Sequence, residues 1–376
     1  MASCVSKPWS FAFCFSRFRR SISISRASLD IWLKRCIVSS FFAILLFIVP
    51  GGRDEKQPGG HRRGVGKIAV VLLFIDGVGL GEMADHNPWV TYPTPCIRQL
   101  LGGMPLVREA AGRHGPDLLL LETDACLGVE GLPQSATGQA TIFTGKNAAR
   151  EMGKHMSGLP FRRLREWVKK DNIYLQFEKK GWKATFANAY TKEYFERPAT
   201  KRGWVSVTTA TIQSSGEPVR FFPELVEGKA VYHDITRTIL KKSGTDVEEI
   251  TPEQAARHLW SIASGYDLVV HEFFLSDRAG HKQDPWLLQY VTHHYDRFLG
   301  ELARLKGPED TIVLVSDHGN SEDLRVKTHT ANPVPTLVIG DIDAFSEVDT
   351  GAWDLTGIVP LLHRIVSRNK NEVKDR

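Results

Sequence analysis

Four short runs of apolar residues limit most strongly what this chain can fold into. They are KIAVVLLFI (Lys67–Ile75), DLVVHEFFL (Asp267–Leu275), TIVLVS (Thr311–Ser316) and PTLVIG (Pro335–Gly340). Continuous runs rich in Val, Ile and Leu are typical of strands that are buried on both faces, as in the parallel sheets of α/β proteins. Each run therefore predicts a central strand of a buried sheet.

Helical patterns lie between these runs. The segment Thr251–Gln254 combines a capping Thr, a Pro at the first helical position and a Gln at the capping-box position, which predicts a helix to about Ser264. Apolar residues three and four apart from Leu288 to Leu305 predict a second helix, which Gly307 ends. Alternating strands and helices predict an α/β fold with a doubly wound, mostly parallel sheet.

The middle of the chain has a different character. Residues 150–243 are rich in Arg, Lys and aromatic residues, and they lack long apolar runs. The segments ATFANA (184–189) and WVSVTTATI (204–212) are interpreted as short strands. We predict that residues 150–243 form a small α+β cap inserted into a core made of residues 67–149 and 244–376.

The first 66 residues form a leader of unusual composition. Residues 1–67 contain 12 of the 48 Lys and Arg but only 3 of the 43 acidic residues. An apolar run of 14 residues, Cys36–Val49, is short for a bilayer span of about 20 residues but suits a signal peptide. Three readings stay open: a signal or membrane anchor, a transit peptide, or upstream sequence translated from a misassigned start.

The charge of the remaining chain restricts its partners. Residues 68–376 carry 36 basic and 40 acidic residues, so the excess of positive charge belongs to the leader. A mildly acidic body argues against a nucleic-acid partner. We expect a cytoplasmic protein that acts on a small molecule, with a membrane contact only if the leader is a genuine anchor.

Three of the apolar runs lead into an acidic residue. Asp76 follows the first run, Asp277 the second and Asp317 the third. In open α/β sheets, ligands bind beyond the carboxyl ends of the strands, so these three carboxylates are expected to converge at one edge. His281, His318 and His329 follow in the same loops, which adds three imidazoles to the site.

This combination of side chains predicts a metal centre. Mixed Asp and His ligands suit Mn²⁺, which we expect first, or Zn²⁺ as the alternative, and six such groups are enough for two ions. Two divalent ions about 4 Å apart are a usual arrangement for in-line phosphoryl transfer. The other histidines, His155, His233, His258, His271, His293 and His294, are interpreted as structural.

Ser135 is the candidate nucleophile. The segment Pro133–Ala140 (PQSATGQA) is typical of a turn that enters a helix, with Ser135 at the helix N-terminus. Free backbone N–H groups there favour an anion. A serine beside a metal can lose its proton and attack phosphorus. The alternative for the peptide alone is an ordinary N-cap.

Other nucleotide and hydrolase motifs do not fit. The spacing of Gly77, Gly79 and Gly81 is not GxGxxG, and Gly145-Lys146-Asn147 lacks the other residues of a P-loop. The surroundings of Ser135 are not GxSxG, although a metal-independent Ser–His–Asp esterase stays a second mechanism.

Five segments, in this order, resemble the alkaline phosphatase superfamily: IDGVGLGE, SATGQATIFTG, DRAGH, SDHGNSED and HTANPVP. Among its members they are most similar to cofactor-independent phosphoglycerate mutase and phosphopentomutase. The resemblance implies that Asp76, Asp317 and His318 hold one metal with the Ser135 oxygen. It also implies that Asp277, His281 and His329 hold the second metal. It places Ser135 as the phosphorylated residue.

The same resemblance implies candidates for substrate binding. Lys146 stands where the mutases have a basic residue near the phosphate, and Arg150, Arg162, Arg197 and Arg202 of the cap are further candidates for an anionic substrate. Gln139 departs from the pattern because both mutases usually have His there. The short insertion is closer in size to the cap of phosphopentomutase than to the transferase domain of phosphoglycerate mutase.

These features lead to one expectation and several alternatives. We expect a metal-dependent phosphotransferase or phosphohydrolase that acts through a phosphoserine on a small phosphorylated metabolite, as in the two mutases. A phosphatase, a phosphodiesterase or a membrane-anchored phosphotransferase of the same superfamily is the first alternative. The esterase and a non-catalytic scaffold that keeps the fold are the others.

Overall fold

The computed structural model describes residues 68–345 and 353–374. The predicted leader, residues 1–66, and the start of the first apolar run lie outside the described residues. Within the described parts of the chain, no helix is both long and apolar enough to cross a membrane.

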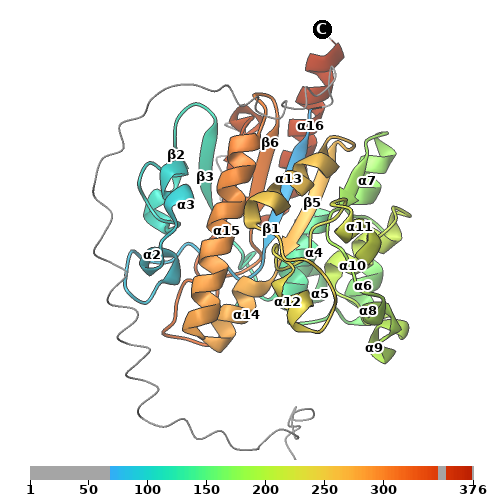
Figure 1. The fold of residues 1–376 in the computed structure, drawn as a ribbon, viewed down its shortest axis with the longest axis horizontal. Helices are drawn as coiled ribbons and strands as arrows, with labels where there is room; N and C mark the ends of the chain where they lie inside the picture. Colours follow the sequence, from blue (N-terminus) through green and yellow to red (C-terminus); the bar gives the residue numbers. More distant parts are fainter. Residues whose placement is uncertain (1–67, 346–352, 375–376) are drawn as a thin grey trace, which may run out of the picture. The chain divides into compact units, whose positions relative to one another are not determined.

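A sheet of seven strands forms the centre of the fold (Figure 1). In spatial order the strands are β2 (Gly112–Arg113), β3 (Leu118–Thr123), β7 (Val334–Ile339), β6 (Thr311–Val315), β1 (Val70–Ile75), β5 (Leu268–Phe273) and β4 (Ala184–Phe186). The neighbours β6, β1, β5 and β4 are parallel, with Leu72 of β1 opposite both Val270 and Val313. β7 runs antiparallel to β6 and to β3, so the sheet is mixed at that side.

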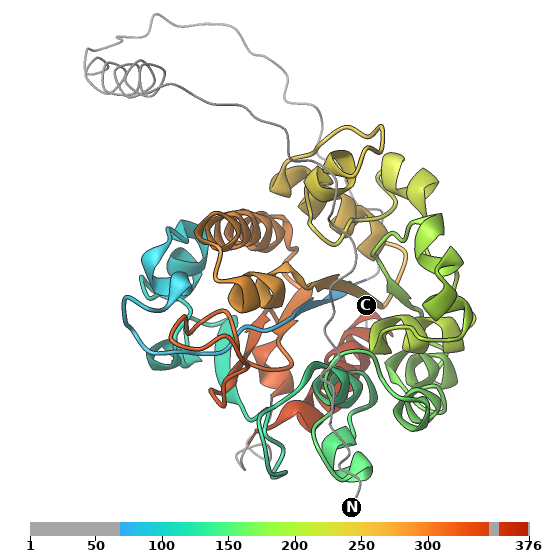
Figure 2. The ribbon, with the colours of Figure 1, turned by 90° about the horizontal axis from the view of Figure 1, so that it is seen from below.

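Both faces of the sheet are covered by helices. Successive residues of a strand point to opposite faces, and accordingly Val71 and Leu73 of β1 pack in one buried cluster while Leu72 and Phe74 pack in another. Figure 2 shows α15 and α16 on opposite sides of the sheet. The predicted α/β class with a doubly wound, mostly parallel sheet is therefore confirmed.

The helices fall into three groups. The first face carries α2 (Pro88–Thr91), α3 (Pro95–Leu100), α13 (Pro252–Ala263), α14 (Leu275–Lys282) and α15 (Pro285–Leu305). The second carries α4 (Ser135–Thr144), α5 (Ala148–Met152), α6 (Arg162–Val168), α7 (Ile173–Lys179), α10 (Val207–Ser214) and α16 (Ile358–Lys374). The remaining helices are α8 (Lys192–Glu196), α9 (Pro198–Lys201), α11 (Phe222–Val226) and α12 (Thr238–Lys242).

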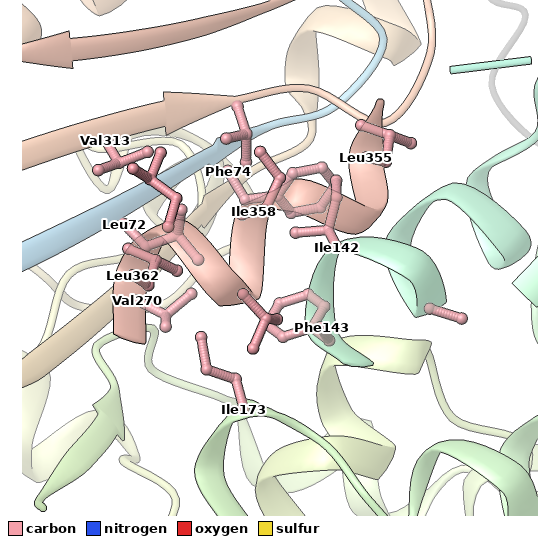
Figure 3. Close-up of a cluster of buried hydrophobic side chains, with 14 of the residues drawn as sticks. Leu72, Phe74, Ile142, Phe143, Ile173, Val270, Val313, Leu355, Ile358 and Leu362 are labelled. Atoms are coloured by element: carbon pink, nitrogen blue, oxygen red, sulfur yellow. The ribbon is translucent and has the colours of Figure 1, made fainter. Parts of the chain in front are cut away.

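The second face packs α4 against the sheet. Figure 3 shows Ile142 and Phe143 of α4 near Phe74 of β1 and near Ile358 and Leu362 of α16. The rings of Phe74 and Phe143 meet edge to face, with centroids 6.3 Å apart. All residues of α4 after Ser135 are buried, so the sheet and α16 fix the position of the helix that begins at Ser135.

Local signals were correct for α13 and α15 and wrong for α10. The Thr251 and Gln254 side chains form the capping box that begins α13, as predicted. Residues 204–212, predicted as a short strand, instead hold most of helix α10 (Val207–Ser214). The Ser206 hydroxyl accepts the Thr209 N–H and begins this helix, and burial of its β-branched residues against α4 and α7 outweighs their preference for strands.

Candidate active site

The strand ends bring the predicted acidic residues together. Asp76 directly follows β1, Asp277 lies in the first turn of α14 after β5, and Asp317 follows β6. Because β1 lies between β5 and β6 in the parallel part of the sheet, the three loops meet at one edge. We name the predicted metal ligands at this edge the strand-end cluster: Asp76, Asp277, His281, Asp317, His318 and His329.

One group of possible metal ligands is Asp76, Asp317 and His318. His318 Nε2 lies 3.3 Å from Asp76 Oδ1 and 3.6 Å from Asp317 Oδ2, and all three residues are buried. Asp76 Oδ1 receives no hydrogen bond from the described residues, although it is buried. A buried carboxylate oxygen without a partner is costly, and a bound cation would compensate it. The donor set therefore fits a metal ion.

The second group is Asp277, His318 and His329, with His281 beside it. His281 Nε2 and His329 Nε2 lie 3.4 and 3.7 Å from the same oxygen, Asp277 Oδ1. The rings of His318 and His329 stack with centroids 3.6 Å apart, which joins the two groups. The predicted ligands thus converge in one continuous cluster, within which His318 is shared.

The imidazoles of the cluster share one orientation. Nδ1 of His281, His318 and His329 contacts the carbonyl oxygen of Lys327, Gly319 and Pro133 at 2.8, 3.2 and 2.8 Å, respectively. Because a carbonyl oxygen can only accept, each Nδ1 must carry the proton. The neutral form of each ring then offers the Nε2 lone pair to the cluster. Backbone contacts of this kind commonly orient histidine ligands of metals.

The charges of the cluster are mutually dependent. Burial and the Asp317 charge raise the pKa of Asp76 well above its ordinary value, and burial raises the pKa of Asp317 to about 6. Burial lowers the pKa of His318, but the carboxylates of Asp317 and Asp76 outweigh it and raise that pKa to about 10. The carboxylates thus draw positive charge into a buried site, which a divalent ion would supply.

Ser135 is placed among these groups, as predicted. It is the first residue of α4, and its Oγ lies 2.9 Å from His318 Nε2. Gly138, one turn later, permits this approach: a Cβ there would lie only 2.7 Å from the carbonyl oxygen of Asp317. The hydroxyl therefore stands at the N-terminus of a buried helix, where backbone N–H groups favour an anion.

Two polar residues that carried no functional prediction hold the cluster together. The Gln139 amide nitrogen lies 3.3 Å from both Asp76 Oδ2 and Asp317 Oδ2, so it donates to the two carboxylates. Glu322 is fully buried, and its carboxylate accepts the backbone N–H groups of Gly79 and Asn320 at 2.9 and 2.7 Å. Glu322 thereby ties the loop after β6 to the loop after β1.

A cavity of 470 Å³ opens beside the cluster, and Asp76, Ser135 and Asp277 are in its lining. Among the described residues its basic side chains are Arg197, which was a candidate, and Arg278, which was not. Arg278 stands inside the DRAGH segment, so its position next to Asp277 could have indicated it. His233, which was interpreted as structural, also lines the cavity.

Lys146 and Arg150 do not line this cavity in the described part of the chain. Lys146 follows α4 at the end opposite Ser135, about 15 Å along a helix of this length, and its Nζ pairs with Asp171 at 2.6 Å. Arg150 is exposed on α5. Arg162 and Arg202 are also exposed and lie outside the lining.

Comparisons with known proteins identify the family of the chain. A family model described as the Metalloenzyme superfamily matches residues 68–353. The 2,3-bisphosphoglycerate-independent phosphoglycerate mutase of Ruegeria sp. (strain TM1040) is 33% identical over 117 residues, which cover 29% of this chain and 23% of the mutase. The mutase of the same name from Acetivibrio thermocellus is 24% identical over 184 residues, covering 45% and 34%. The chain thus matches only a minor part of the length of these relatives.

Two solved structures match most of this chain at low sequence identity. Alkaline phosphatase from the Antarctic bacterium TAB5 has a TM-score of 0.47 at 13% identity, covering 81% of this chain and 99% of that one. Leishmania mexicana phosphoglycerate mutase has a TM-score of 0.40 at 12% identity, covering 78% and 94%. The family model spans more than half of the sequence and includes every residue of the strand-end cluster, and the chain is therefore a metalloenzyme of the alkaline phosphatase superfamily.

Proposed function

We propose that this enzyme transfers a phosphoryl group from a small phosphorylated substrate through a phosphoserine at Ser135. The observation that carries the proposal is the position of Ser135 Oγ, 2.9 Å from His318 Nε2 at the edge of a metal-type cluster and in the wall of a cavity. In the first half-reaction the Oγ–P bond forms while the bond from phosphorus to the leaving oxygen breaks. In the second, water or another hydroxyl takes the phosphoryl group from Ser135.

Two divalent ions complete the site in this proposal. Asp76, Asp317 and His318 would hold one ion with the Ser135 oxygen, and Asp277, His281 and His329 would hold the other. Mixed carboxylate and imidazole ligands favour Mn²⁺, with Zn²⁺ as the alternative. When bound, such ions ease deprotonation of a hydroxyl and neutralise charge on transferring phosphoryl oxygens. Gln139 and Glu322 would keep the ligands in place.

The geometry of His318 argues against the esterase alternative. In a Ser–His–Asp triad, one ring nitrogen contacts the serine and the other contacts the carboxylate. Here Ser135 Oγ, Asp76 Oδ1 and Asp317 Oδ2 all lie near Nε2, at 2.9, 3.3 and 3.6 Å. Nδ1 contacts the Gly319 carbonyl instead. Several oxygen atoms around one imidazole nitrogen suit a metal better than a proton relay.

A mutase is the second candidate. It is favoured by the names of the curated relatives, which are phosphoglycerate mutases, although this chain matches only part of them. A mutase would return the phosphoryl group to a second hydroxyl of the same substrate, and a phosphatase would give it to water. The two reactions share the first half-reaction at Ser135.

The test is metal content together with turnover of the full chain. We expect about two Mn or Zn ions per chain by elemental analysis, and either phosphate release or isomer interconversion from sugar phosphates and phosphoglycerates. Ser135→Ala should retain the metal and lose turnover by at least about 1,000-fold, whereas Ser264→Ala, an exposed serine at the end of α13, should not change turnover. Unchanged turnover in Ser135→Ala, or a chain that binds no metal, would contradict the proposal.

A further inference from the structure

Rings form much of the cavity lining beside the candidate metal ligands. We name these residues the aromatic wall: Phe186, Tyr190, Tyr194, Tyr232, His233 and Phe274. They come from β4 and the segment after it, from α8, from the loop before α12, and from the residue after β5. With a volume of 470 Å³, the cavity is within the range of about 300–1,000 Å³ that is common for pockets that bury a ring-bearing small molecule.

One side of the aromatic wall offers rings rather than hydroxyl groups. The ring centroids of Tyr190 and Tyr194 are 5.3 Å apart, and Phe186 lies 6.1 Å from Tyr190. The hydroxyls of both tyrosines lie 3.0 and 3.2 Å from Thr209 Oγ1, so they already have a partner. The Arg197 guanidinium lies 5.7 Å from the Tyr194 centroid, which places a cation against the same ring.

The other side is a short stack around an uncharged imidazole. His233 lies 4.2 Å from the Tyr232 centroid and stacks on Phe274 at 4.3 Å with an interplanar angle of 24°. Burial lowers the pKa of His233 to about 3, so the ring is neutral at physiological pH. Its Nδ1 is buried and has no hydrogen-bond partner among the described residues. This side of the aromatic wall is therefore uncharged and mainly apolar.

Glu272 adds an uncharged polar group to the cavity lining. Glu272 lines the cavity, and its carboxylate contacts the Thr208 hydroxyl at 3.2 Å. Burial raises the pKa of Glu272 to about 8, so this side chain is largely protonated and uncharged at neutral pH. Arg197 and Arg278, which also line the cavity, can meet the charge of a phosphoryl group, and an uncharged ring with a polar substituent is compatible with Glu272 and with the rings.

We infer that the substrate is a phosphate monoester whose alcohol part carries a planar aromatic ring, held by the aromatic wall while the phosphoryl group lies at Ser135. This inference rests on the proposed function. The bond from phosphorus to the ring-bearing alcohol oxygen breaks as the Ser135 Oγ–P bond forms, and the leaving oxygen takes up a proton. Water then attacks the phosphoserine and releases inorganic phosphate. A simple aryl ester and a nucleoside monophosphate share this chemistry.

Binding to the full-length Ser135→Ala chain loaded with Mn²⁺ tests the inference without turnover. Calorimetry would compare phenyl phosphate, adenosine 5′-monophosphate, glycerol 2-phosphate and 3-phosphoglycerate. We expect at least one ring-bearing ester to bind about tenfold tighter than both ring-free esters, because one aromatic contact contributes about that factor. Whether phenyl phosphate or the nucleotide binds more tightly distinguishes the two kinds of alcohol.

Substitutions at Tyr194 locate the preference. In the Ser135→Ala background, Tyr194→Leu keeps apolar volume but removes the ring. This change should weaken binding of the ring-bearing ester about fivefold or more, whereas the affinity for the ring-free esters should change less than about twofold. Tyr194→Phe is the matched control and should keep the preference. Circular dichroism checks that each variant is folded.

The outcomes separate this inference from the proposed function. Equal affinity for ring-bearing and ring-free esters, no binding of any ester, or a preference that persists in Tyr194→Leu would overturn the inference. Metal-dependent turnover of ring-free esters with no ring preference would leave the proposed function intact. Ring-selective binding to a wild-type chain that transfers no phosphoryl group would contradict the proposed function alone.

Discussion

The strand-end cluster and the aromatic wall face the same cavity but are held in different ways. Every imidazole of the cluster has its Nδ1 on a backbone carbonyl, and Glu322 links the loops after β1 and β6 through backbone N–H groups. The aromatic wall is held mainly by ring-to-ring packing and by the Thr209 hydroxyl. Hydrogen bonds fix angles as well as distances, whereas packing fixes shape. The strand-end cluster, which would perform the chemistry, is therefore the more closely specified of the two.

The largest effect should come from removing one imidazole of the cluster. His329→Ala removes a candidate ligand, so we expect metal content to fall from about two ions to about one per chain, and kcat/KM to fall at least about 100-fold. Elemental analysis and kinetics measure both. His294→Ala is the matched control, because its Nδ1 also contacts a carbonyl, Tyr290 O at 2.7 Å, but it lies on α15 outside the cluster. Two ions in both variants would remove His329 from the site.

Glu322→Gln tests whether the cluster is fixed by its buried hydrogen bonds. The change removes the charge that accepts the Gly79 and Asn320 N–H groups, so the free energy of unfolding should fall by about 1–3 kcal/mol in urea. Glu248→Gln changes an exposed acid and should have little effect. If both variants unfold at the same urea concentration as the wild type, Glu322 does not brace the loops.

The raised pKa values predict how pH acts on the metal-free protein. A folded-state pKa of about 10 for His318, against an ordinary 6.5, means that the folded chain holds more protons than the unfolded chain between these values. Stability should therefore fall as pH rises from 6.5 towards 10, and Asp317 acts in the same direction between 3.8 and about 6. Thermal unfolding after chelation measures this slope. A bound divalent ion or the substitution His318→Gln should each reduce this dependence of stability on pH. If neither changes it, the dependence does not arise from His318.

The smallest effect is expected at Lys146, which belongs to neither the strand-end cluster nor the aromatic wall. Its ion pair with Asp171 is largely exposed, so Lys146→Ala should change the free energy of unfolding by less than about 1 kcal/mol. We expect kcat/KM to stay within about twofold. A loss greater than tenfold would instead mean that Lys146 reaches the substrate, as the resemblance to the mutases implies.

The same contrast explains what could be predicted from the sequence. Asp76 and Asp317 directly follow uninterrupted apolar runs, so their place at the sheet edge follows from the strands alone. Glu322 could not be predicted as a brace, because its role depends on N–H groups that only the folded loops bring together. The aromatic wall had no sequence signal either, since its rings come from separate short elements with no common spacing. Helix α10 was wrongly predicted as a strand, because the packing on α4 and α7 that makes its Val and Thr residues helical is visible only in the fold.

The close approach at Gly138 has a consequence for redesign. Since no side chain fits between α4 and the Asp317 carbonyl, the distance from the nucleophile to the cluster cannot be adjusted by substitution at that position. The segment that carries Tyr190 and Tyr194 is under no such constraint, because it contributes no ligand. Exchanging that segment is therefore a direct route to enzymes that share one phosphoryl-transfer centre but accept different alcohols.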